Sequence, residues 1–208
     1  MPDTRNRPAA GRQAAGRQAI IDAAREEFAA RGFDAASVRD IAARAGVSLS
    51  ALYHYYPGKQ ALLEGIIATG LEAYFASCTA ALAAAGEDPA RRLTALVAAT
   101  VRHRAHHRVD SRIVLGEARS VSPEFRVHHR ARLREATALF ADAITAGLTR
   151  GTFTTPHPDD ARRAVIAMCN AVAQWYDPTG PTPVPTLERH YADLALTLVG
   201  YRPAVPEW

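Results

Sequence analysis

Apolar residues recur every three or four positions along most of the chain, and no segment shows the two-residue alternation of a half-buried strand. Signals for helix starts and stops divide this pattern, such as Ser122-Pro123 before one apolar stretch and Gly86, Gly151 and Gly200 after others. The predicted helices cover residues 16–31, 38–45, 49–56, 59–86, 90–107, 111–120, 123–150, 155–176 and 186–200. The pattern therefore predicts an all-α fold of about nine helices.

The most informative stretch, residues 37–59, reads SVRDIAARAGVSLSALYHYYPGK. It begins with Ser37, which can cap a short amphipathic helix, and Gly46 suits the left-handed residue that ends one. Ser48 offers a second cap, about two helical turns follow, and Pro57 ends them. Two short helices joined by a tight glycine turn predict a helix-turn-helix, although such helix pairs also occur in folds that do not bind DNA.

The second of these helices is too short to be stable alone, so its i,i+4 pair Leu52 and Tyr56 is expected to pack inward. The residues then left outside are Leu49, Ser50, Tyr53 and His54. Small hydroxyl side chains and aromatic polar tips suit a DNA major groove and its phosphates. Lys59, the only lysine in the chain, is expected at the start of the next helix, where a phosphate is favoured.

The segment from about Gln18 to Leu63, with Phe28 and RGFDAASVRDIAARAGVSLSALYHYYPGKQALL, resembles the N-terminal domain of the TetR family of one-component transcriptional regulators. The resemblance implies sequence-specific binding of double-stranded DNA and makes Leu52 and Tyr56 packing residues. The DNA-facing set that it implies is Ser37, Ser48, Leu49, Ser50, Tyr53, His54, Tyr55 and Lys59. Many relatives read Tyr-Tyr-His-Phe where this chain reads Tyr-His-Tyr-Tyr, so the phosphate contact is either His54 or Tyr55.

Composition and charge are compatible with this interpretation. The chain has 208 residues, of which 48% are hydrophobic, which is enough for a real core in one domain or two small ones. Its net charge is +4, and residues 1–60 hold nine Lys and Arg against six Asp and Glu, so most of the excess lies in the predicted DNA-binding part. Nearly all basic residues are Arg and Ala is abundant, which a GC-rich genome would also produce.

The chain is expected to be cytoplasmic, without a membrane span, cofactor or metal. No apolar run approaches the roughly 18 residues of a membrane helix, and residues 1–16 lack the apolar centre of a signal peptide. Cys78 and Cys169 stand far apart in the sequence with no CxxC or Cys/His spacing, so they are expected to be free thiols.

Three regions are expected: a flexible basic arm over residues 1–14, the helix-turn-helix domain over 15–60, and an all-helical ligand-binding and dimerisation domain over 61–208. Arginines of the arm could follow DNA phosphates or enter the minor groove, or the arm could be a tail without effect on specificity. The long helix that begins at Lys59 is expected to connect the two larger domains.

A homodimer is expected, because a palindromic operator presents two half-sites about 34–36 Å apart to two copies of one motif. The last two long helices are the expected interface. The residues predicted for it are Val165, Ile166, Ala173, Leu194, Leu198 and Tyr201, each of which could equally be core.

The remaining helices are expected to enclose a small hydrophobic effector. The predicted lining consists of Tyr74, Phe75, Cys78, Val101, Ile113, Phe125, Phe140, Met168, Cys169, Asn170 and Trp175, with ordinary core packing as the alternative for each. Asn170 is distinct because a mid-helix amide needs a hydrogen-bond partner. The segment from Trp175 to Pro181, with Arg189-His-Tyr-Ala-Asp-Leu-Ala-Leu, resembles the end of actinobacterial TetR members that respond to acyl-CoA thioesters, so an acyl-CoA is one candidate effector.

A basic, histidine-rich patch has three open interpretations: a metal site, a rim for CoA phosphates, or a solvated helix face. It consists of Arg102, His103, Arg104, His106, His107, Arg108 and Arg112, followed by His128, His129, Arg130 and Arg132. A metal-dependent enzyme using His103, His106 and His107, or one with a Cys169 nucleophile, lacks an orienting carboxylate, and the sequence contains no GxSxG or HExxH motif. The predicted function is a homodimeric repressor released from its operator by the effector, with a ligand-independent DNA-binding regulator as the alternative.

Overall fold

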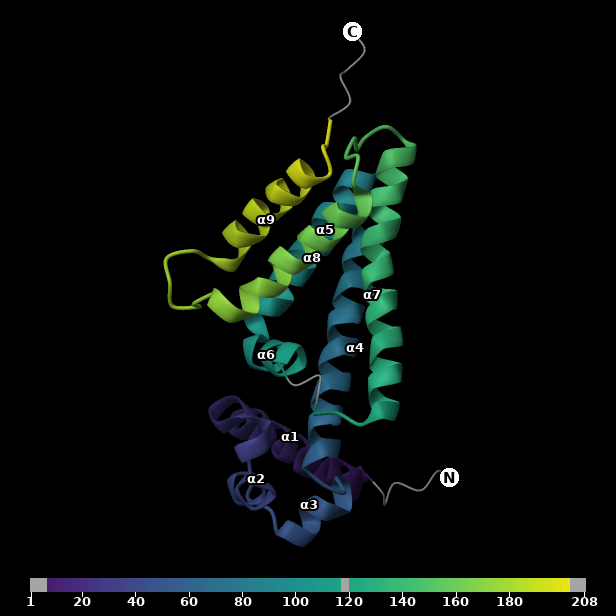
Figure 1. Cartoon of the computed structure of the whole chain (residues 1–208). Helices are drawn as coiled ribbons and strands as arrows, with labels where there is room; N and C mark the ends of the chain where they lie inside the picture. Colours follow the sequence, from purple (N-terminus) through teal and green to yellow (C-terminus); the bar gives the residue numbers. More distant parts are fainter. Residues whose placement is uncertain (1–6, 117–119, 203–208) are drawn as a thin grey trace. The chain divides into compact units, whose positions relative to one another are not determined.

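The computed structural model describes residues 7–116 and 120–202, and the side chains of all of these except 7–14, 114 and 115. Within those residues the chain forms nine helices and no strand, which confirms the predicted fold class (Figure 1). The helices are α1 (Arg7–Ala35), α2 (Val38–Arg44), α3 (Leu49–Tyr55), α4 (Lys59–Ala85), α5 (Pro89–His106), α6 (Arg108–Gly116), α7 (Pro123–Thr149), α8 (Pro158–Trp175) and α9 (Val184–Leu198).

The chain divides into two compact units. The first unit contains the described residues as far as Gly70 together with Arg112–Val127, and the second contains Leu71–Ser111 and the described residues from His128 onward. The single boundary expected after residue 60 is therefore replaced by three crossings, which fall within α4, α6 and α7. The reason is that Ile113 and Val121 are buried with the core of the first unit, which the sequence pattern alone could not indicate.

α1 begins at Arg7 rather than near residue 16, so residues 7–14 of the predicted arm are helical, while residues 1–6 lie outside the described chain. Ala, Arg and Gln have high helix propensity, which here outweighs the glycines among them. The regular geometry of α1 is broken at Gly32, where φ is 74° and ψ is 168°. Residues with a side chain rarely adopt this conformation, so the predicted stop at Gly32 has a steric cause.

Two other helix starts test the capping signals. Ser122 caps α7 as expected, because its Oγ accepts the N–H of Phe125 at 3.2 Å. α9 begins at Val184 with Pro183 as its cap and no side-chain cap bond, so it starts two residues before the predicted start at residue 186. Proline is tolerated in the first turn because an N–H at that position has no partner within the helix.

The first unit has a core built from α1, α2, α3 and the beginning of α4. Its fully buried side chains include Ile20, Ile41, Leu52, Leu62 and Ile66. These residues repeat at helical spacing, so each helix presents one apolar stripe to its neighbours. Three separate helices and the start of a fourth thus share one small core.

A buried carboxylate links α1 to α2 in this unit. Glu27 is 1% exposed, and its oxygens lie 3.2 Å from Nη1 of Arg31 and 3.5 Å from Nη2 of Arg44. The same arginines also pair with exposed carboxylates, Arg31 with Asp40 at 3.1 Å and Arg44 with Glu26 at 2.9 Å. Because a buried charge is costly without partners, this network favours one orientation of α2 on α1.

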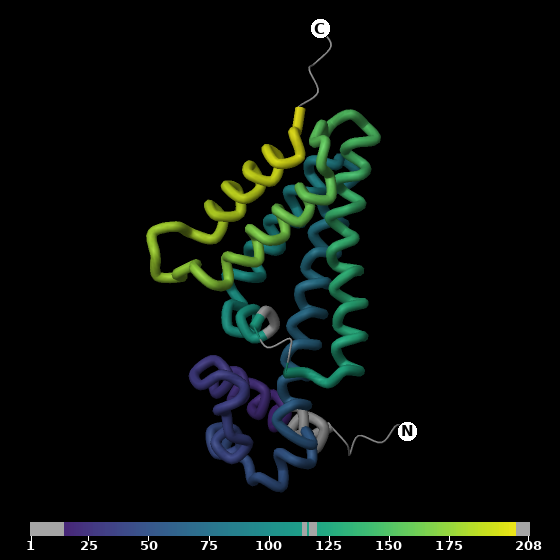
Figure 2. The backbone as a smooth tube through the Cα atoms, in the orientation of Figure 1, coloured from purple at the N-terminus to yellow at the C-terminus, as the bar shows by residue number. Residues whose placement is uncertain are grey.

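The second unit is organised around α5, which packs against both α8 and α9, while α8 also packs against α9. The apolar face of α5 carries Leu93, Leu96, Val97 and Val101, all fully buried. The backbone trace shows the long proline-rich connection that leads from α8 back to α9 (Figure 2). This connection occupies the gap between the predicted helices 155–176 and 186–200.

In the described part of the chain, α4 is long and apolar enough to cross a membrane by length and composition, with a mean hydropathy of 1.4. Its apolar residues are used within the folded units, however. Leu62 and Ile66 are buried in the first unit, and Leu71 and Cys78 in the second. Glu64 and Glu72 interrupt the apolar run.

We predict that Gly147→Ala destabilises the protein. A β-carbon at this position of α7 would lie 2.0 Å from Cδ2 of Phe153, which is itself fully buried. Overpacking of this kind lowers the free energy of unfolding by about 1–3 kcal/mol, although alanine normally stabilises a helix relative to glycine.

Urea denaturation followed by circular dichroism measures this effect. Gly65→Ala in α4 is the matched control, because the nearest atom to its added carbon would be 3.4 Å away, and it should be neutral or slightly stabilising. Equal stability of Gly147→Ala and wild type would contradict the packing of Phe153 on α7.

Candidate functional site

The turn between α2 and α3 is closed by a pair of backbone hydrogen bonds. The N–H of Gly46 donates to the carbonyl of Ala43 at 3.1 Å, and that of Val47 donates to Ala42, also at 3.1 Å. Gly46 has φ 68°, in the left-handed region that disfavours a β-carbon. These features together form a Schellman motif, so the predicted stop at Gly46 is confirmed.

α3 is attached to the first unit through one face. Leu52 is 0% and Tyr56 is 5% exposed, which confirms the predicted inward pair. The Nε of Arg17 donates to the phenolic oxygen of Tyr56 at 3.1 Å, which joins α1 to the end of α3. A helix of seven residues is not stable alone, so these contacts determine how its other face is presented.

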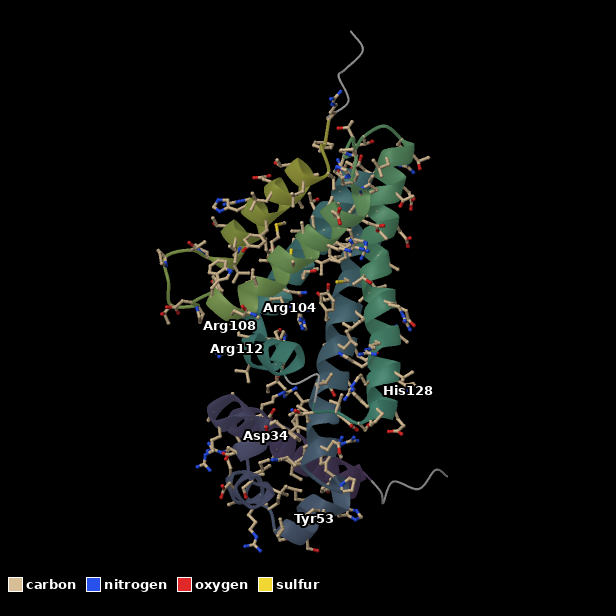
Figure 3. All side chains as sticks on the ribbon, in the orientation of Figure 1. Asp34, Tyr53, Arg104, Arg108, Arg112 and His128 are labelled. Carbon is tan, nitrogen blue, oxygen red and sulfur yellow. The ribbon has the colours of Figure 1, made fainter. Side chains whose placement is uncertain are left out.

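The exposed face of α3 is narrower than the sequence predicted. Ser50, Tyr53 and His54 are exposed, and Tyr53 lies at the edge of the first unit (Figure 3). Leu49 and Tyr55 are instead half-buried and pack against the core of this unit. Of the two alternatives for a phosphate contact, His54 is the accessible one, since the side chain of Tyr55 is used in packing.

Both predicted serine caps are formed. The Oγ of Ser48 accepts the N–H of Ala51 at 3.1 Å, and the Oγ of Ser37 accepts the N–H of Arg39 at 3.2 Å. These oxygens satisfy free donors at the starts of α3 and α2. The hydroxyl hydrogens can still donate to an acceptor outside the protein.

Lys59 begins α4, as the sequence suggested, but its ammonium is engaged within the protein. Its Nζ donates to the carbonyl of Asp34 at 2.9 Å and to that of Ala36 at 3.1 Å. The ammonium also lies 4.6 Å from the ring centroid of Phe33, within the range of a cation–π contact. From the first residue of α4, the lysine therefore supplies hydrogen bonds to the carbonyls of Asp34 and Ala36 at the end of α1.

Arg39 is the cation that sequence reasoning missed. It lies on α2, directly after the cap and Val38, and it is exposed. Among the described residues its guanidinium has no ion-pair partner, whereas Arg31 and Arg44 in the same unit are paired with carboxylates. Its position two residues after Ser37, in the predicted motif, was the available signal.

The predicted effector-lining residues do not form one set. Tyr74, Cys78, Val101, Phe140 and Cys169 are buried in the core of the second unit, with Phe75 and Met168 packed against it. Ile113 and Phe125 belong to the first unit instead, because α6 and the start of α7 contribute to that core. Trp175 is 52% exposed at the end of α8, which contradicts an enclosed position.

A polar group lies within the second unit at the C-terminal part of α5. Arg104 donates from Nε to Oδ1 of Asn170 at 3.0 Å and from Nη1 to Oγ of Ser111 at 3.4 Å. Its guanidinium carbon lies 4.7 Å from the ring centroid of Tyr74, and the hydroxyls of Tyr74 and Thr100 are 3.1 Å apart. The predicted partner of the Asn170 amide is therefore a side chain from α5.

The titratable neighbours of this group are held neutral. Burial raises the pKa of the Cys169 thiol to about 12 and also raises the pKa values of Cys78 and Tyr74. Burial, with smaller contributions from Arg104 and His107, lowers the pKa of His103 to about 3. A thiol that stays protonated is a poor nucleophile, and the Cys169 side chain is also fully buried.

The basic, histidine-rich patch is not one surface. His103 is buried with its ring 4.6 Å from that of His107, whereas His106 is exposed. Arg102 makes a bidentate pair with Glu188 at 2.7 and 2.8 Å, and Arg132 makes one with Glu72 at 2.7 Å. Over the described ranges, no three His, Cys, Asp or Glu side chains are grouped to hold a metal, so His103, His106 and His107 do not converge as a three-ligand site would require.

A groove of about 570 Å³ runs between α4, α5 and α9 of the second unit. Its lining consists mainly of alanines and also includes the Arg102–Glu188 pair, Arg91 and Arg189. None of the predicted effector-lining residues contributes to it.

The predicted dimer residues separate into two classes. Val165 and Ala173 are fully buried within the second unit, so their side chains belong to its core and are not available to a partner. Ile166 and Tyr201 are partly buried against that core. Leu194 and Leu198, in contrast, are 52% and 40% exposed on α9.

Family models match both parts of the chain. A model described as "Bacterial regulatory proteins, tetR family" matches residues 20–66. A second, described as "Tetracyclin repressor-like, C-terminal domain", matches residues 86–199, more than half of the chain. The first covers the helix-turn-helix described above, and the second covers most of the second unit.

Similar proteins agree with these matches. The HTH-type transcriptional repressor KstR2 of Mycolicibacterium smegmatis is 29% identical over 202 residues, covering 96% of this chain and 94% of that protein. The crystal structure of a tetR family regulatory protein from Rhodococcus RHA1 is 32% identical with a TM-score of 0.84, covering 90% of this chain and 98% of that one. AibR, solved with isovaleryl coenzyme A and operator DNA, has the same fold at 20% identity, with a TM-score of 0.78 over 90% of this chain and all of that one.

We predict that Lys59→Met lowers stability more than it weakens DNA binding. Methionine keeps the length of the side chain but leaves two carbonyls without their donor, so the free energy of unfolding should fall by about 1–3 kcal/mol in urea denaturation. Arg39→Gln, an exposed change on α2, should stay within about 0.5 kcal/mol of wild type. Unchanged stability of Lys59→Met with a weaker salt dependence of DNA binding would instead make Lys59 a phosphate contact.

Proposed function

Because this chain belongs to the TetR family of DNA-binding transcriptional repressors, we propose that it acts in the cytoplasm as a homodimer that binds a palindromic operator and is released by a small hydrophobic effector. The observation that carries the DNA-binding part is the exposed face of α3, held on the core by Leu52 and Tyr56.

The proposed DNA contacts lie on α2 and α3. Ser50, Tyr53 and His54 are exposed on α3, where a hydroxyl, a phenol and an imidazole can bond base edges or phosphates. Arg39 adds an exposed guanidinium on the neighbouring helix. The cap residues Ser37 and Ser48 can donate their hydroxyl hydrogens to DNA. Half-buried Leu49 and Tyr55 instead pack α3 against the core of the first unit.

The proposed dimer follows from the reading of two half-sites, since one motif contacts only a few base pairs. Leu194 and Leu198 on α9 and Trp175 at the end of α8 are large apolar side chains exposed on the protomer. Exposed apolar residues at i and i+4 favour a helix-to-helix contact with a second copy. Ile166 and Tyr201 can extend this surface, whereas Val165 and Ala173 cannot.

The proposed effector acts through the second unit. All three chain crossings between the units fall within helices, so a change in the second unit has a continuous helical path to α4 and the motif that precedes it. A ligand shifts such an equilibrium only if it binds the two states with different affinity, and reversing a 99:1 population requires roughly 5 kcal/mol. AibR binds isovaleryl coenzyme A and operator DNA, so an acyl-CoA thioester is the first candidate to test.

We predict that two substitutions on the proposed DNA surface have different effects. Arg39→Gln should weaken binding to all DNA sequences alike and lower the salt slope by about one, because one phosphate contact is lost. Ser50→Ala should change the ranking of operator variants by about 1 kcal/mol, since it alters contact with base edges.

Fluorescence anisotropy with a labelled fragment from upstream of the protein's own gene measures both effects across a series of salt concentrations. Arg163→Met on α8, an exposed arginine outside this surface, serves as the control and should leave affinity unchanged. The same uniform loss for Arg39→Gln and Ser50→Ala would mean that α3 does not read the bases.

We predict that isovaleryl coenzyme A releases the dimer from this fragment and raises its melting temperature, both with the same concentration dependence. Free coenzyme A is the matched control and should do neither, because it lacks the acyl group. DNA retention that no acyl-CoA alters, with an unchanged melting temperature, would support the ligand-independent regulator instead.

A further inference from the structure

Arg104 is a charged side chain placed inside a helical core. It lies near the C-terminal end of α5 and is 7% exposed (Figure 3). Its orientation is fixed on three sides, by Asn170 at Nε, by Ser111 at Nη1 and by the ring of Tyr74 beneath the guanidinium. All three groups are formally neutral, so they orient the guanidinium without balancing its charge.

Nothing else in the described chain balances that charge. No Asp or Glu among the described residues lies within ion-pair distance of Arg104, in contrast to Arg102 and Arg132, which each hold a carboxylate in a bidentate pair. The nearby phenol, thiols and imidazole are neutral at neutral pH, as described above. Taking a cation out of water without an anion is strongly unfavourable, so an uncompensated charge here needs an explanation.

The hydrogen-bond donors of Arg104 are also incompletely used. Its Nε and Nη1 each have one acceptor, and its Nη2 has none in the ranges 7–116 and 120–202. The guanidinium therefore has N–H groups left that can donate to an acceptor from outside the chain.

We propose that Arg104 binds a carboxylate within the second unit, and that a small hydrophobic acid is therefore a tighter ligand of this unit than the acyl-CoA thioester considered above. A carboxylate both accepts from the unused N–H groups and neutralises the guanidinium, whereas the neutral carbonyl of a thioester only accepts. The surroundings suit an apolar remainder, because Val97, Val101 and Phe140 belong to the same buried core. The inference rests on the proposed function only in its last step, the release from DNA.

Small probes avoid any assumption about the rest of the ligand. Sodium formate, compared with sodium chloride at equal ionic strength, should raise the melting temperature of wild type by about 2 °C, and uncharged formamide should not. The same increase should persist in Arg163→Met, an exposed arginine of α8 that pairs with Asp160, and disappear in Arg104→Met.

Two variants test the uncompensated charge without a ligand. Arg104→Met removes the charge and should raise the melting temperature of the protein in chloride buffer, because methionine fills similar space without desolvating a cation. Asn170→Asp places a carboxylate on the acceptor that is 3.0 Å from Nε, and it should both raise the melting temperature and abolish the response to formate. A merely structural arginine would give a lower melting temperature for Arg104→Met.

The outcomes separate this inference from the proposed function. Lower stability of both variants, or equal responses of wild type and Arg104→Met to formate, would overturn the role of Arg104, even if DNA release by an acyl-CoA were observed. Retention of the operator fragment is measured in parallel on wild type. Its absence would count against the proposed function, while a charge-dependent response to formate would still support the carboxylate site.

Discussion

The contact on which the presented surface depends is the attachment of α3 by Leu52 and Tyr56, together with the left-handed turn at Gly46 that brings the helix there. A helix of seven residues cannot maintain its own structure in water, so its exposed side chains have a defined position only while the inner pair stays buried. Two internal charge contacts strengthen this frame. Glu27 ties α2 to α1, and Lys59 closes the end of α1 from the start of α4.

The arginines of the second unit differ in the groups that they contact. Arg102 pairs with Glu188 and Arg132 with Glu72, and these pairs join helices that are distant in sequence. Arg104 instead faces hydroxyl, amide and aromatic groups. Natural proteins often have lower stability where a site must bind a ligand. A buried cation without a counter-charge lowers the stability of the free protein in this way.

The two units are joined through helices rather than through flexible segments. The chain passes between the units within α4, α6 and α7. Packed helices respond to a ligand by moving between discrete arrangements, since their interdigitated side chains resist continuous deformation. This covalent arrangement suits a regulator in which binding at one site changes the affinity of another.

The sequence by itself determined the all-α class, the helix-turn-helix, the stop at Gly46 and the inward pair of α3, because these depend on residues within a few positions of one another. Only the tertiary structure decided that Lys59 bonds the carbonyl of Asp34, that Ile113 joins the first unit, and that Val165 is core while Leu194 is exposed. Each of these outcomes depends on a partner distant in the sequence. Local periodicity states which residues are apolar or charged, but the partner of a side chain is chosen by packing between helices.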